Sequence, residues 1–252
     1  MIIPIGETTK VEPLFAGWHD TLIRSCMQGI MGEIYAEDVK EPRSAFALLG
    51  DFCLLAGEPS KDLLRFQKQI GPWSSRILVP STEPWAELIR ETYGQSIHEC
   101  TRYALKKTAN FDQEKLKSAV LALDTRFRLL EIDEVLYHVL LADPWSKDLV
   151  GQFPTYERFR DLALGFVVME DQRVVSGAST YCRYHGGIEI EVDTRESYRR
   201  KGLAYSCSAK LIDAALQRGL FPSWDAHTEA SLQLALKLGY ELDYPYQCFT
   251  RA

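Results

Sequence analysis

The 252-residue chain lacks the apolar run of about 20 residues that a membrane-spanning helix needs, so no membrane association is expected. Its N-terminus, Met1–Pro4, is not a basic segment followed by an apolar run, so we expect no signal peptide. The six cysteines are scattered singly without a C-x-x-C, and histidine, with five residues, is too sparse for a Cys/His zinc site. These absences predict a cytoplasmic protein with reduced, mostly buried thiols and no metal centre.

Positive charge is also in short supply, because 29 lysines and arginines face 35 aspartates and glutamates, for a formal net charge of −6. General affinity for nucleic acid needs a basic surface, so no nucleic-acid partner is expected. A local basic patch occurs at Arg199–Lys201, but aromatic residues do not interleave with it as they do on surfaces that bind single strands.

The sequence does contain apolar strand-like runs that alternate with short helix-like segments, which is typical of α/β or α+β proteins. In the first half, Ala45–Gly57 is expected to form two strands around a Gly-Asp turn, and Leu14–Met31 is expected to be helical. We place a boundary near Leu121–Thr125, which gives an N-terminal α/β domain over residues 1–124 and a second domain over residues 125–252. Self-similarity between the two halves is not legible from the residues.

The second half has a clearer pattern. Leu162–Met169 and Arg173–Tyr181 are expected to pair as a hairpin around a Glu-Asp-Gln turn. A strand is expected to open at Gly187, and from Ile188 to Thr194 apolar and acidic residues alternate, which is the period of a strand with two unlike faces. After a basic loop and an amphipathic helix, Leu220–Ala226 is expected to be the next strand, and Thr228 is placed to cap the helix that follows.

The basic loop Arg199-Arg200-Lys201-Gly202 leads into a helix that begins at Leu203, and this arrangement predicts an anion site. The first N–H groups of a helix have no intrahelical partner, and the helix dipole favours negative charge there. Gly202 lets the backbone approach a ligand closely, and the basic side chains suit phosphate. The spacing follows neither G-x-x-x-x-G-K-[ST] nor G-x-G-x-x-G. A solvated helix start is the alternative interpretation.

Two motifs give a family resemblance. The spacing Arg199-x-x-Gly202-x-Ala204 resembles the [QR]-x-x-G-x-[GA] motif of the GNAT N-acetyltransferases. The segment Ala230–Tyr240 resembles the A-S-x-x-L-A-x-K-x-G-[FY] sequence near the end of that superfamily, and the order of elements from Arg126 onward is also that of a GNAT domain. The resemblance implies a mixed central sheet flanked by helices, preceded by a smaller α/β domain for which a degenerate GNAT-like half is one interpretation.

The chain also resembles one branch of that superfamily. Asp193-Thr194 and Pro222-x-Trp224-Asp225 look like the branch that contains the zwittermicin-resistance-type acetyltransferases. In that branch a GNAT domain follows an N-terminal half of related α/β character, in which this chain has no matching motif.

The resemblance implies an N-acetyltransferase that moves the acetyl group of acetyl-CoA, its co-substrate, to a primary amine of a small molecule by direct attack in a ternary complex. In the family, the backbone at the end of the acidic strand polarises the thioester and the loop holds the pyrophosphate. Carried over to this chain, the cofactor-binding residues are Val192, Asp193, Thr194, Arg199, Arg200, Lys201, Gly202, Leu203, Ala204, Thr228 and Ser231. Thr228 stands where many members have an Asn that contacts the pantetheine arm. A homodimer is a further candidate assembly.

Three carboxylates are candidates for the general base. Glu189, Glu191 and Asp193 alternate along the acidic strand, so we expect them on one face. Neighbouring like charges and desolvation both raise the pKa of a carboxyl group, toward the range in which a base works near neutral pH. The family places its carboxylate base on this strand, so Glu189 is the first choice and Glu191 the second. A solvated acidic face, or one that attracts a cationic amine, is the alternative.

The general acid has no direct match, because the Tyr that many members carry on the last helix falls at Ala235. Tyr240 and Tyr205 are substitutes by proximity, with packing as the alternative role of each, and water is a third choice. The missing Tyr also leaves open a second function, a non-catalytic acyl-CoA-binding or regulatory module.

Overall fold

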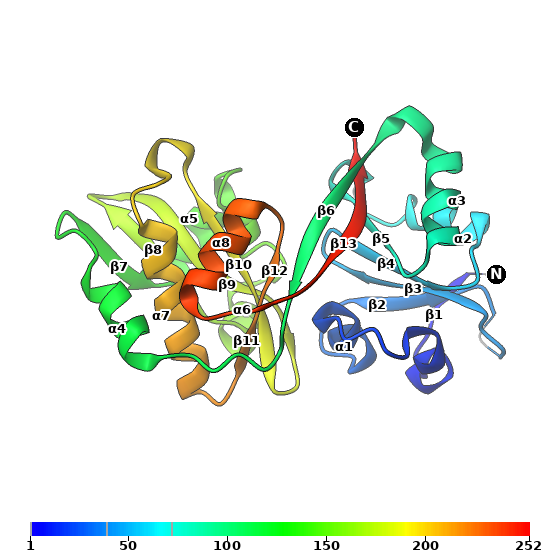
Figure 1. Ribbon diagram of the computed structural model, residues 1–252, viewed down its shortest axis with the longest axis horizontal. Helices are drawn as coiled ribbons and strands as arrows, with labels where there is room; N and C mark the ends of the chain where they lie inside the picture. Colours follow the sequence, from blue (N-terminus) through cyan, green and yellow to red (C-terminus); the bar gives the residue numbers. More distant parts are fainter. Residues whose placement is uncertain (1, 39, 72) are drawn as a thin grey trace. The chain divides into compact units, whose positions relative to one another are not determined.

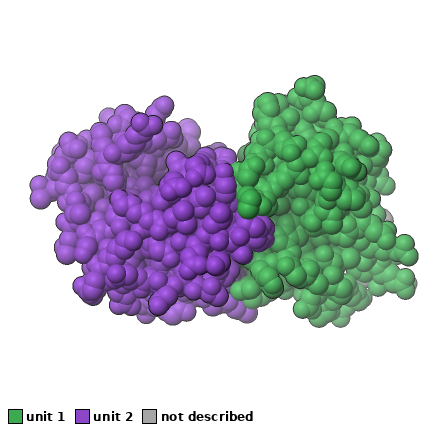
Figure 2. Space-filling view, in the orientation of Figure 1, with its two compact units in different colours: residues 1–102, 245–252 green, residues 103–244 purple. Residues whose placement is uncertain are grey.

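The computed structural model describes residues 2–38, 40–71 and 73–252. The chain divides into two compact units, of which unit 1 contains residues 1–102 and 245–252 and unit 2 contains residues 103–244 (Figures 1 and 2). No helix of the described residues is long and apolar enough to cross a membrane.

These units differ from the predicted ranges 1–124 and 125–252 in two segments. Residues 103–124 go with unit 2 because helix α4 (Gln113–Leu121) packs on α7 (Leu203–Gln217), where the Ser206 hydroxyl donates to the Ala119 carbonyl over 2.9 Å. The C-terminal residues go with unit 1 because the end of β13 (Leu242–Arg251) pairs with β5 (Ile77–Pro80).

The strands of unit 1 form a sheet in the order β1-β2-β3-β4-β5-β13-β6. Besides β5 and β13, its elements are β1 (Ile3–Pro4), the 3-10 helices η1 (Thr8–Lys10) and η2 (Glu12–Phe15), α1 (Thr21–Met27), β2 (Glu33–Ala36), β3 (Ser44–Leu49), β4 (Phe52–Gly57), α2 (Lys61–Gln67), η3 (Trp73–Ser75), α3 (Glu83–Tyr93), η4 (Gly94–Ser96) and most of β6 (Ile97–Leu105). The last three residues of β6 belong to unit 2. The β3–β4 hairpin confirms the predicted one. The β4–β5 ladder is parallel, and helices α2 and α3 share a buried apolar cluster with these strands.

The single helix predicted over Leu14–Met31 is wrong, because the structure has η2, a break and then α1. Gly17 interrupts the segment with a φ of +80°, a left-handed conformation that no α-helix contains. Asp20 then starts a new helix, since its carboxylate accepts the Leu22 N–H over 2.7 Å.

The second sheet, which belongs to unit 2, has the strand order β11-β10-β9-β8-β7. Besides α4 and α7, the elements of unit 2 are β7 (Phe127–Glu131), α5 (Glu134–Ala142), the 3-10 helix η5 (Lys147–Leu149), α6 (Tyr156–Leu162), β8 (Gly165–Glu170), β9 (Arg173–Tyr184), β10 (Gly187–Thr194), η6 (Glu196–Tyr198), β11 (Phe221–Ser223), β12 (Asp225–Ala226) and α8 (Glu229–Leu238). The β7–β8, β8–β9 and β9–β10 ladders are antiparallel, and β10–β11 is parallel.

Two strand predictions in this half need correction. The strand predicted over Leu162–Met169 starts at Gly165, because helix α6, capped by Thr155, extends to Leu162. The strand predicted over Leu220–Ala226 is divided into β11, which pairs with β10, and β12, which pairs with β6 through Asp225 and Ala226.

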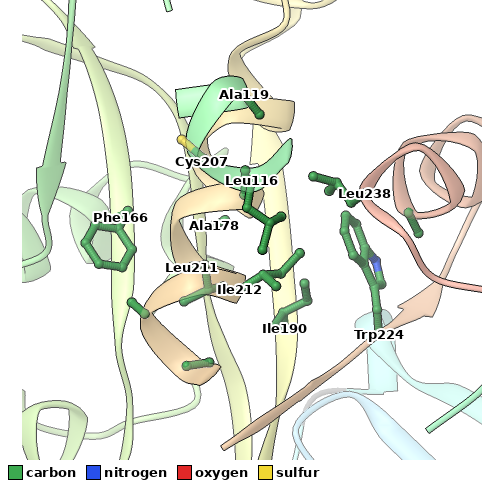
Figure 3. Close-up of a cluster of buried hydrophobic side chains, with 14 of the residues drawn as sticks. Leu116, Ala119, Phe166, Ala178, Ile190, Cys207, Leu211, Ile212, Trp224 and Leu238 are labelled. Atoms are coloured by element: carbon green, nitrogen blue, oxygen red, sulfur yellow. The ribbon is translucent and has the colours of Figure 1, made fainter. Parts of the chain in front are cut away.

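Helix α7 is the centre of the unit 2 core, as Figure 3 shows. Its buried face (Cys207, Leu211 and Ile212) meets side chains from α4, from three strands of the sheet and from α8. These partners include Leu116, Ala119, Phe166, Ala178, Ile190 and Leu238. Trp224 closes the cluster between β11 and β12. Packing of this kind fixes the start of α7, at Gly202, relative to β10.

The two units repeat one order of elements. In each, a first strand and helical segments precede a three-stranded antiparallel meander, and then come a helix, a strand parallel to the last meander strand, and another helix. Thus β4–α2–β5 of unit 1 corresponds to β10–α7–β11 of unit 2. The structure therefore contains an internal repeat of architecture that the sequence does not reveal.

The expectation of uniformly reduced cysteines is wrong for one pair. Cys100 on β6 and Cys248 on β13 form a disulfide with their Cα atoms 5.2 Å apart, although 148 residues separate them in the sequence. The spacing of single cysteines cannot predict such a bond, because their proximity depends on the return of the C-terminal strand to unit 1. Cys26, Cys53, Cys182 and Cys207 are free and buried, as expected.

Candidate active site

Strands β10 and β11 pair over a short length and then separate. Their parallel ladder ends at Glu189 and Ser223, and the chain beyond Trp224 becomes β12, which pairs with β6. Beyond Glu189, β10 continues to Thr194 in its ladder with β9. The residue Tyr181 is extra on β9 at this point, so a β-bulge lies opposite the place where β10 and β11 part.

The two faces of β10 differ as the alternation predicts. Ile188 and Ile190 are buried in the α7 cluster, so the side chains of Glu189, Glu191 and Asp193 point to the opposite face. Glu189 is 4% exposed, whereas Glu191 and Asp193 are partly buried. The three carboxylates therefore form a row along β10 that runs from the buried Glu189 toward the basic loop.

Glu189 lies among polar groups from several elements. Its Oε2 is 3.9 Å from Nζ of Lys107, which follows β6. Tyr184 on β9 and Ser223 on β11 flank β10, and both residues are buried. Their hydroxyl groups form a hydrogen bond of 2.8 Å with each other. The Tyr184 ring crosses over Gly187, where a Cβ atom would collide with its hydroxyl group. A carboxylate in this position is enclosed but accompanied by a cation.

The far end of the row is tied to the loop. Burial raises the pKa of the Asp193 carboxyl group, while the Thr194 N–H, which it accepts over 2.6 Å, and the charge of Arg199 act in the opposite direction. The Ser176 hydroxyl donates to the Asp193 carbonyl over 3.2 Å and lies 2.7 Å from the Thr194 hydroxyl. Val192 packs against the α7 cluster. The backbone over 192–194 is thus held on both sides.

The basic loop follows immediately. Arg195 is held against α5, because its guanidinium pairs with Asp143 over 2.7 Å and stacks on Trp145 with its central carbon 5.0 Å from the ring centre. Arg199 and Arg200 are exposed, and Nε of Arg199 donates to the Thr194 carbonyl over 3.3 Å. Lys201 is exposed too and lies over a tyrosine ring, that of Tyr198, at 4.4 Å.

The loop reaches α7 through two left-handed residues, Arg200 with a φ of +62° and Gly202 with a φ of +80°. Gly202 is the N-cap residue of α7, and among the described residues no side chain caps this helix. A Cβ atom on Gly202 would meet no described atom within 4 Å, so the space in front of the helix is open. Leu203 anchors the first turn in the core, and Ala204 is partly buried. The predicted anion site therefore has the geometry of an uncapped helix N-terminus beside basic side chains.

The predicted contacts on α8 occur at its start. The exposed Thr228 caps the helix by accepting the Ser231 N–H over 3.1 Å, and Ser231 is partly buried. Ala235, at the position of the absent Tyr, is fully buried. Tyr205 on α7 lies under Lys237, whose Nζ is 4.3 Å from the ring centre.

Tyr240 is placed differently from a proton donor. It is 3% exposed, and its hydroxyl donates to the Pro222 carbonyl over 2.6 Å. Its ring packs edge-on against Trp224 and Phe111. Burial, and then the charges of Glu189 and Tyr184, raise the pKa of Tyr240 well above its ordinary value. This geometry favours a packing role.

Sequence reasoning missed three of the side chains around Glu189. Lys107, Tyr184 and Ser223 belong to no motif, and they come from the segment after β6, from β9 and from β11 respectively. The one local signal is Tyr184 at the end of a strand before His-Gly-Gly, since a bulky ring can lie over a glycine in the neighbouring strand. Nothing in the sequence near Lys107 indicates its contact with Glu189.

Comparisons with known proteins show a family relationship. A family model described as GNAT acetyltransferase matches residues 12–249, and so includes residues of both units. A protein of Bacillus subtilis (strain 168) named as an uncharacterized N-acetyltransferase, YdfB, is 25% identical over 232 residues, which are 88% of this chain and 86% of the relative.

Solved structures are similar over nearly the whole chain. A GCN5-related N-acetyltransferase-like protein from Streptococcus suis 89/1591 is 48% identical with a TM-score of 0.94, covering 98% of each chain. A tandem GNAT protein from the clavulanic acid biosynthesis pathway covers 100% of this chain and 98% of its own at a TM-score of 0.55, and its 10% identity shows a shared fold alone. The chain belongs to the GNAT acetyltransferase family and is an acetyltransferase.

Proposed function

We propose that this acetyltransferase moves the acetyl group of acetyl-CoA to a primary amine of a small molecule, by direct attack within a ternary complex. The observation that carries the proposal is the open, uncapped N-terminus of α7 behind the loop 199–202, which follows the part of β10 that continues beyond its ladder with β11. Glu189 lies on β10 at the end of that ladder.

The residues present fit acetyl-CoA. GNAT enzymes use acetyl-CoA as co-substrate, and its pyrophosphate needs N–H donors and positive charge, which the first turn of α7 and Arg199, Arg200 and Lys201 supply. The backbone of Val192, Asp193 and Thr194 would hold the thioester arm, and Thr228 and Ser231 would border it from α8. Thr228 caps its helix with its hydroxyl oxygen and so keeps its O–H free to donate.

Reaction requires a neutral amine at the thioester. We assign Glu189 as the group that accepts the proton of the substrate ammonium, directly or through one water, with Glu191 as the second choice. The amine nitrogen then bonds to the acetyl carbon as the carbon–sulfur bond breaks. Backbone N–H groups of β10 stabilise the oxygen anion that develops, and holding both reactants in one site supplies much of the rate.

The departing thiolate needs a proton. The Tyr240 hydroxyl is bonded to the Pro222 carbonyl, so we favour water over Tyr240 as its source. Tyr205 is partly buried on α7, beneath Lys237, and stays a candidate by proximity.

The row of carboxylates supports a cationic acceptor. Glu191 and Asp193 are partly buried and continue the row from Glu189, and Asp148 on η5 is near enough to raise the pKa of Asp193. A small molecule with several amino groups, such as a polyamine, an aminoglycoside or an aminopolyol, would be attracted to such a surface.

We propose that unit 1 is a degenerate GNAT-like half that holds no acetyl-CoA of its own. Helix α2, the counterpart of α7, has seven residues, and the Ser60 hydroxyl caps it by accepting the Leu63 N–H over 3.1 Å. The same hydroxyl donates to Glu37, so the Ser60 side chain occupies the start of α2. A phosphate would meet a helix start that already has a side-chain cap. The fold likeness to a tandem GNAT protein supports the same interpretation.

A cytoplasmic location, a homodimer and membership of the zwittermicin-resistance-type branch stay predictions from the sequence.

The test combines two measurements on the full chain. Free-thiol release from acetyl-CoA is followed against a panel of polyamines, aminoglycosides and amino sugars, and acetyl-CoA binding is measured by calorimetry. Thiol release that depends on one of these amines, with an acetylated amine as product, supports the proposal. Tight binding without turnover across the panel would instead support the non-catalytic acyl-CoA-binding module, and absence of binding would contradict the assignment of the loop.

A further inference from the structure

Glu189 is a buried acidic residue. Its side chain is 5% exposed, and it sits at the end of the β10–β11 ladder, where the two strands part. Burial disfavours the charged form of a carboxyl group, so an enclosed glutamate without a cation nearby would bind its proton near neutral pH. A protonated glutamate cannot take a proton from a substrate.

Lys107 supplies a cation at this position. Its Nζ is 3.9 Å from Oε2 of Glu189, and its side chain is 26% exposed, so the ammonium is partly withdrawn from water. The backbone on its N-terminal side is fixed, because Leu105 is buried and the Lys106 N–H donates to the Glu241 carbonyl over 2.9 Å. The ammonium is thus directed to Glu189 by the fold.

Polar groups of the neighbouring strands also lie around Glu189. Across the two ladders it faces Cys182 on β9 and Ser223 on β11. Tyr184 on β9 shares its hydrogen bond with the Ser223 hydroxyl. Tyr240 donates to the Pro222 carbonyl, and its raised pKa keeps it neutral. On its own strand the nearest titratable neighbour is Glu191, whose negative charge also disfavours ionisation of Glu189.

We propose that Lys107 is a positioning residue that holds Glu189 as a carboxylate, oriented to receive the proton of the substrate ammonium. This inference rests on the proposed role of Glu189 as the base. The proton that leaves the amine nitrogen ends on a Glu189 carboxylate oxygen. The Lys107 ammonium makes Glu189 a weaker base but keeps it ionised. Removal of the Lys107 ammonium should therefore lower the reaction rate at low pH and leave the rate at high pH unchanged.

The first experiment measures ionisation without any substrate. Protein labelled with carbon-13 at the glutamate side-chain carboxyls is titrated by NMR, and the Glu189 signal is assigned by its absence in Glu189→Gln. In Lys107→Met the titration midpoint of Glu189 should rise by about one to three pH units, whereas Lys107→Arg should keep it near the wild-type value. Lys106→Met is the matched control, since Lys106 is exposed and pairs with Glu241 at the surface. An unchanged midpoint in Lys107→Met overturns the inference.

The second experiment is the pH profile of kcat/KM with an amine substrate. In Lys107→Met the acid limb of this profile should move to higher pH by the same amount as the NMR midpoint of Glu189. At pH values above the shifted limb, kcat/KM should return to the wild-type value. Loss of rate at every pH would indicate a structural role and overturn the inference. Lys107→Gln provides the same comparison if Lys107→Met does not fold.

The two experiments separate the inference from the proposed function. In Lys107→Met, the NMR titration midpoint of Glu189 could rise while the acid limb of the kcat/KM profile stays where it is in the wild type. That result would support the Lys107–Glu189 pair but exclude Glu189 as the base, and it would overturn the role of Lys107 in catalysis. A raised midpoint in a protein that acetylates no amine of the panel would support the pairing and contradict the proposed reaction.

Discussion

Replacement of Gly202 tests the anion site most directly. Gly202 is exposed, has a φ of +80° and has no described atom within 4 Å of the position of a Cβ. A side chain added here therefore projects into the space in front of α7 without colliding with the fold. Gly202→Asp places a carboxylate where the pyrophosphate is proposed to bind, and Gly202→Asn places a group of nearly the same shape without the charge.

The expected magnitudes follow from this geometry. Both variants force a non-glycine residue into the left-handed region, at a cost of about 1–2 kcal/mol that Asp and Asn share and reduce by local hydrogen bonds. The difference between them is electrostatic. Two like charges about 5 Å apart in water-like surroundings repel by about 0.8 kcal/mol, and the two charges of a pyrophosphate double this to about 1.7 kcal/mol. Gly202→Asp should then bind acetyl-CoA roughly 15-fold more weakly than Gly202→Asn.

Calorimetric titration with acetyl-CoA measures this difference, and thermal unfolding checks that the two variants melt at similar temperatures. The difference in Kd should narrow as salt is added, because the charges are exposed and therefore screened. Equal affinity of the Asp variant, the Asn variant and the wild type would refute the reasoning and place the pyrophosphate elsewhere.

The structure also predicts the effects of changing Glu189, Tyr240 and the Cys100–Cys248 disulfide, and the number of acetyl-CoA molecules bound per chain. Glu189→Gln should slow turnover by about 10²–10⁴-fold and leave acetyl-CoA affinity unchanged, and a wild-type pH–rate profile in this variant would remove Glu189 as the base. Tyr240→Phe should lose about 1 kcal/mol of stability in thermal unfolding, because it loses a hydrogen bond to a backbone carbonyl. Its turnover should stay within about threefold of the wild-type value. Turnover slowed by about two orders of magnitude or more would identify Tyr240 as the general acid instead. Reduction of the Cys100–Cys248 disulfide, or Cys100→Ser, should lower the free energy of unfolding by about 2–4 kcal/mol in denaturant titrations, and an unchanged midpoint would contradict a stabilising role. Calorimetry should find one acetyl-CoA per chain, because Ser60 closes the equivalent helix start in unit 1, and a second site would contradict that argument.

Elements with a strong local pattern were predictable. The acidic strand is β10 over Gly187–Thr194, as its alternation indicates, because one face packs on α7 and the other carries the carboxylates. The break before α1 was not predicted, although Gly17 and Asp20 are both helix-boundary residues, because apolar residues on either side conceal them in a periodicity count. Helix α6 was missed because its polar residues on the exposed side resemble a loop.

In the site, too, local features were predictable from the sequence and non-local contacts were not. The basic loop could be found because Arg199, Gly202 and Ala204 are close in the sequence, and their spacing depends on one local turn. Lys107 could not be found, because its contact with Glu189 depends on where β6 ends relative to β10, which only tertiary packing determines. Tyr240 was predicted from proximity in the sequence to the last helix, and its hydrogen bond to Pro222 is a property of the folded β11 strand.

The repeat of architecture shows why fold and function are predicted by different residues. In both units a helix connects two paired parallel strands and packs against their sheet. This packing requires apolar positions that many sequences can supply, so the repeat leaves no motif. At the start of that helix the two units differ in chemistry. Unit 2 has a left-handed glycine with basic neighbours and an open first turn, whereas unit 1 has a serine whose hydroxyl satisfies the first turn and bonds to a glutamate. We infer that one side chain that caps the helix start, together with the glutamate bonded to it, is enough to remove an anion site while the fold around it persists.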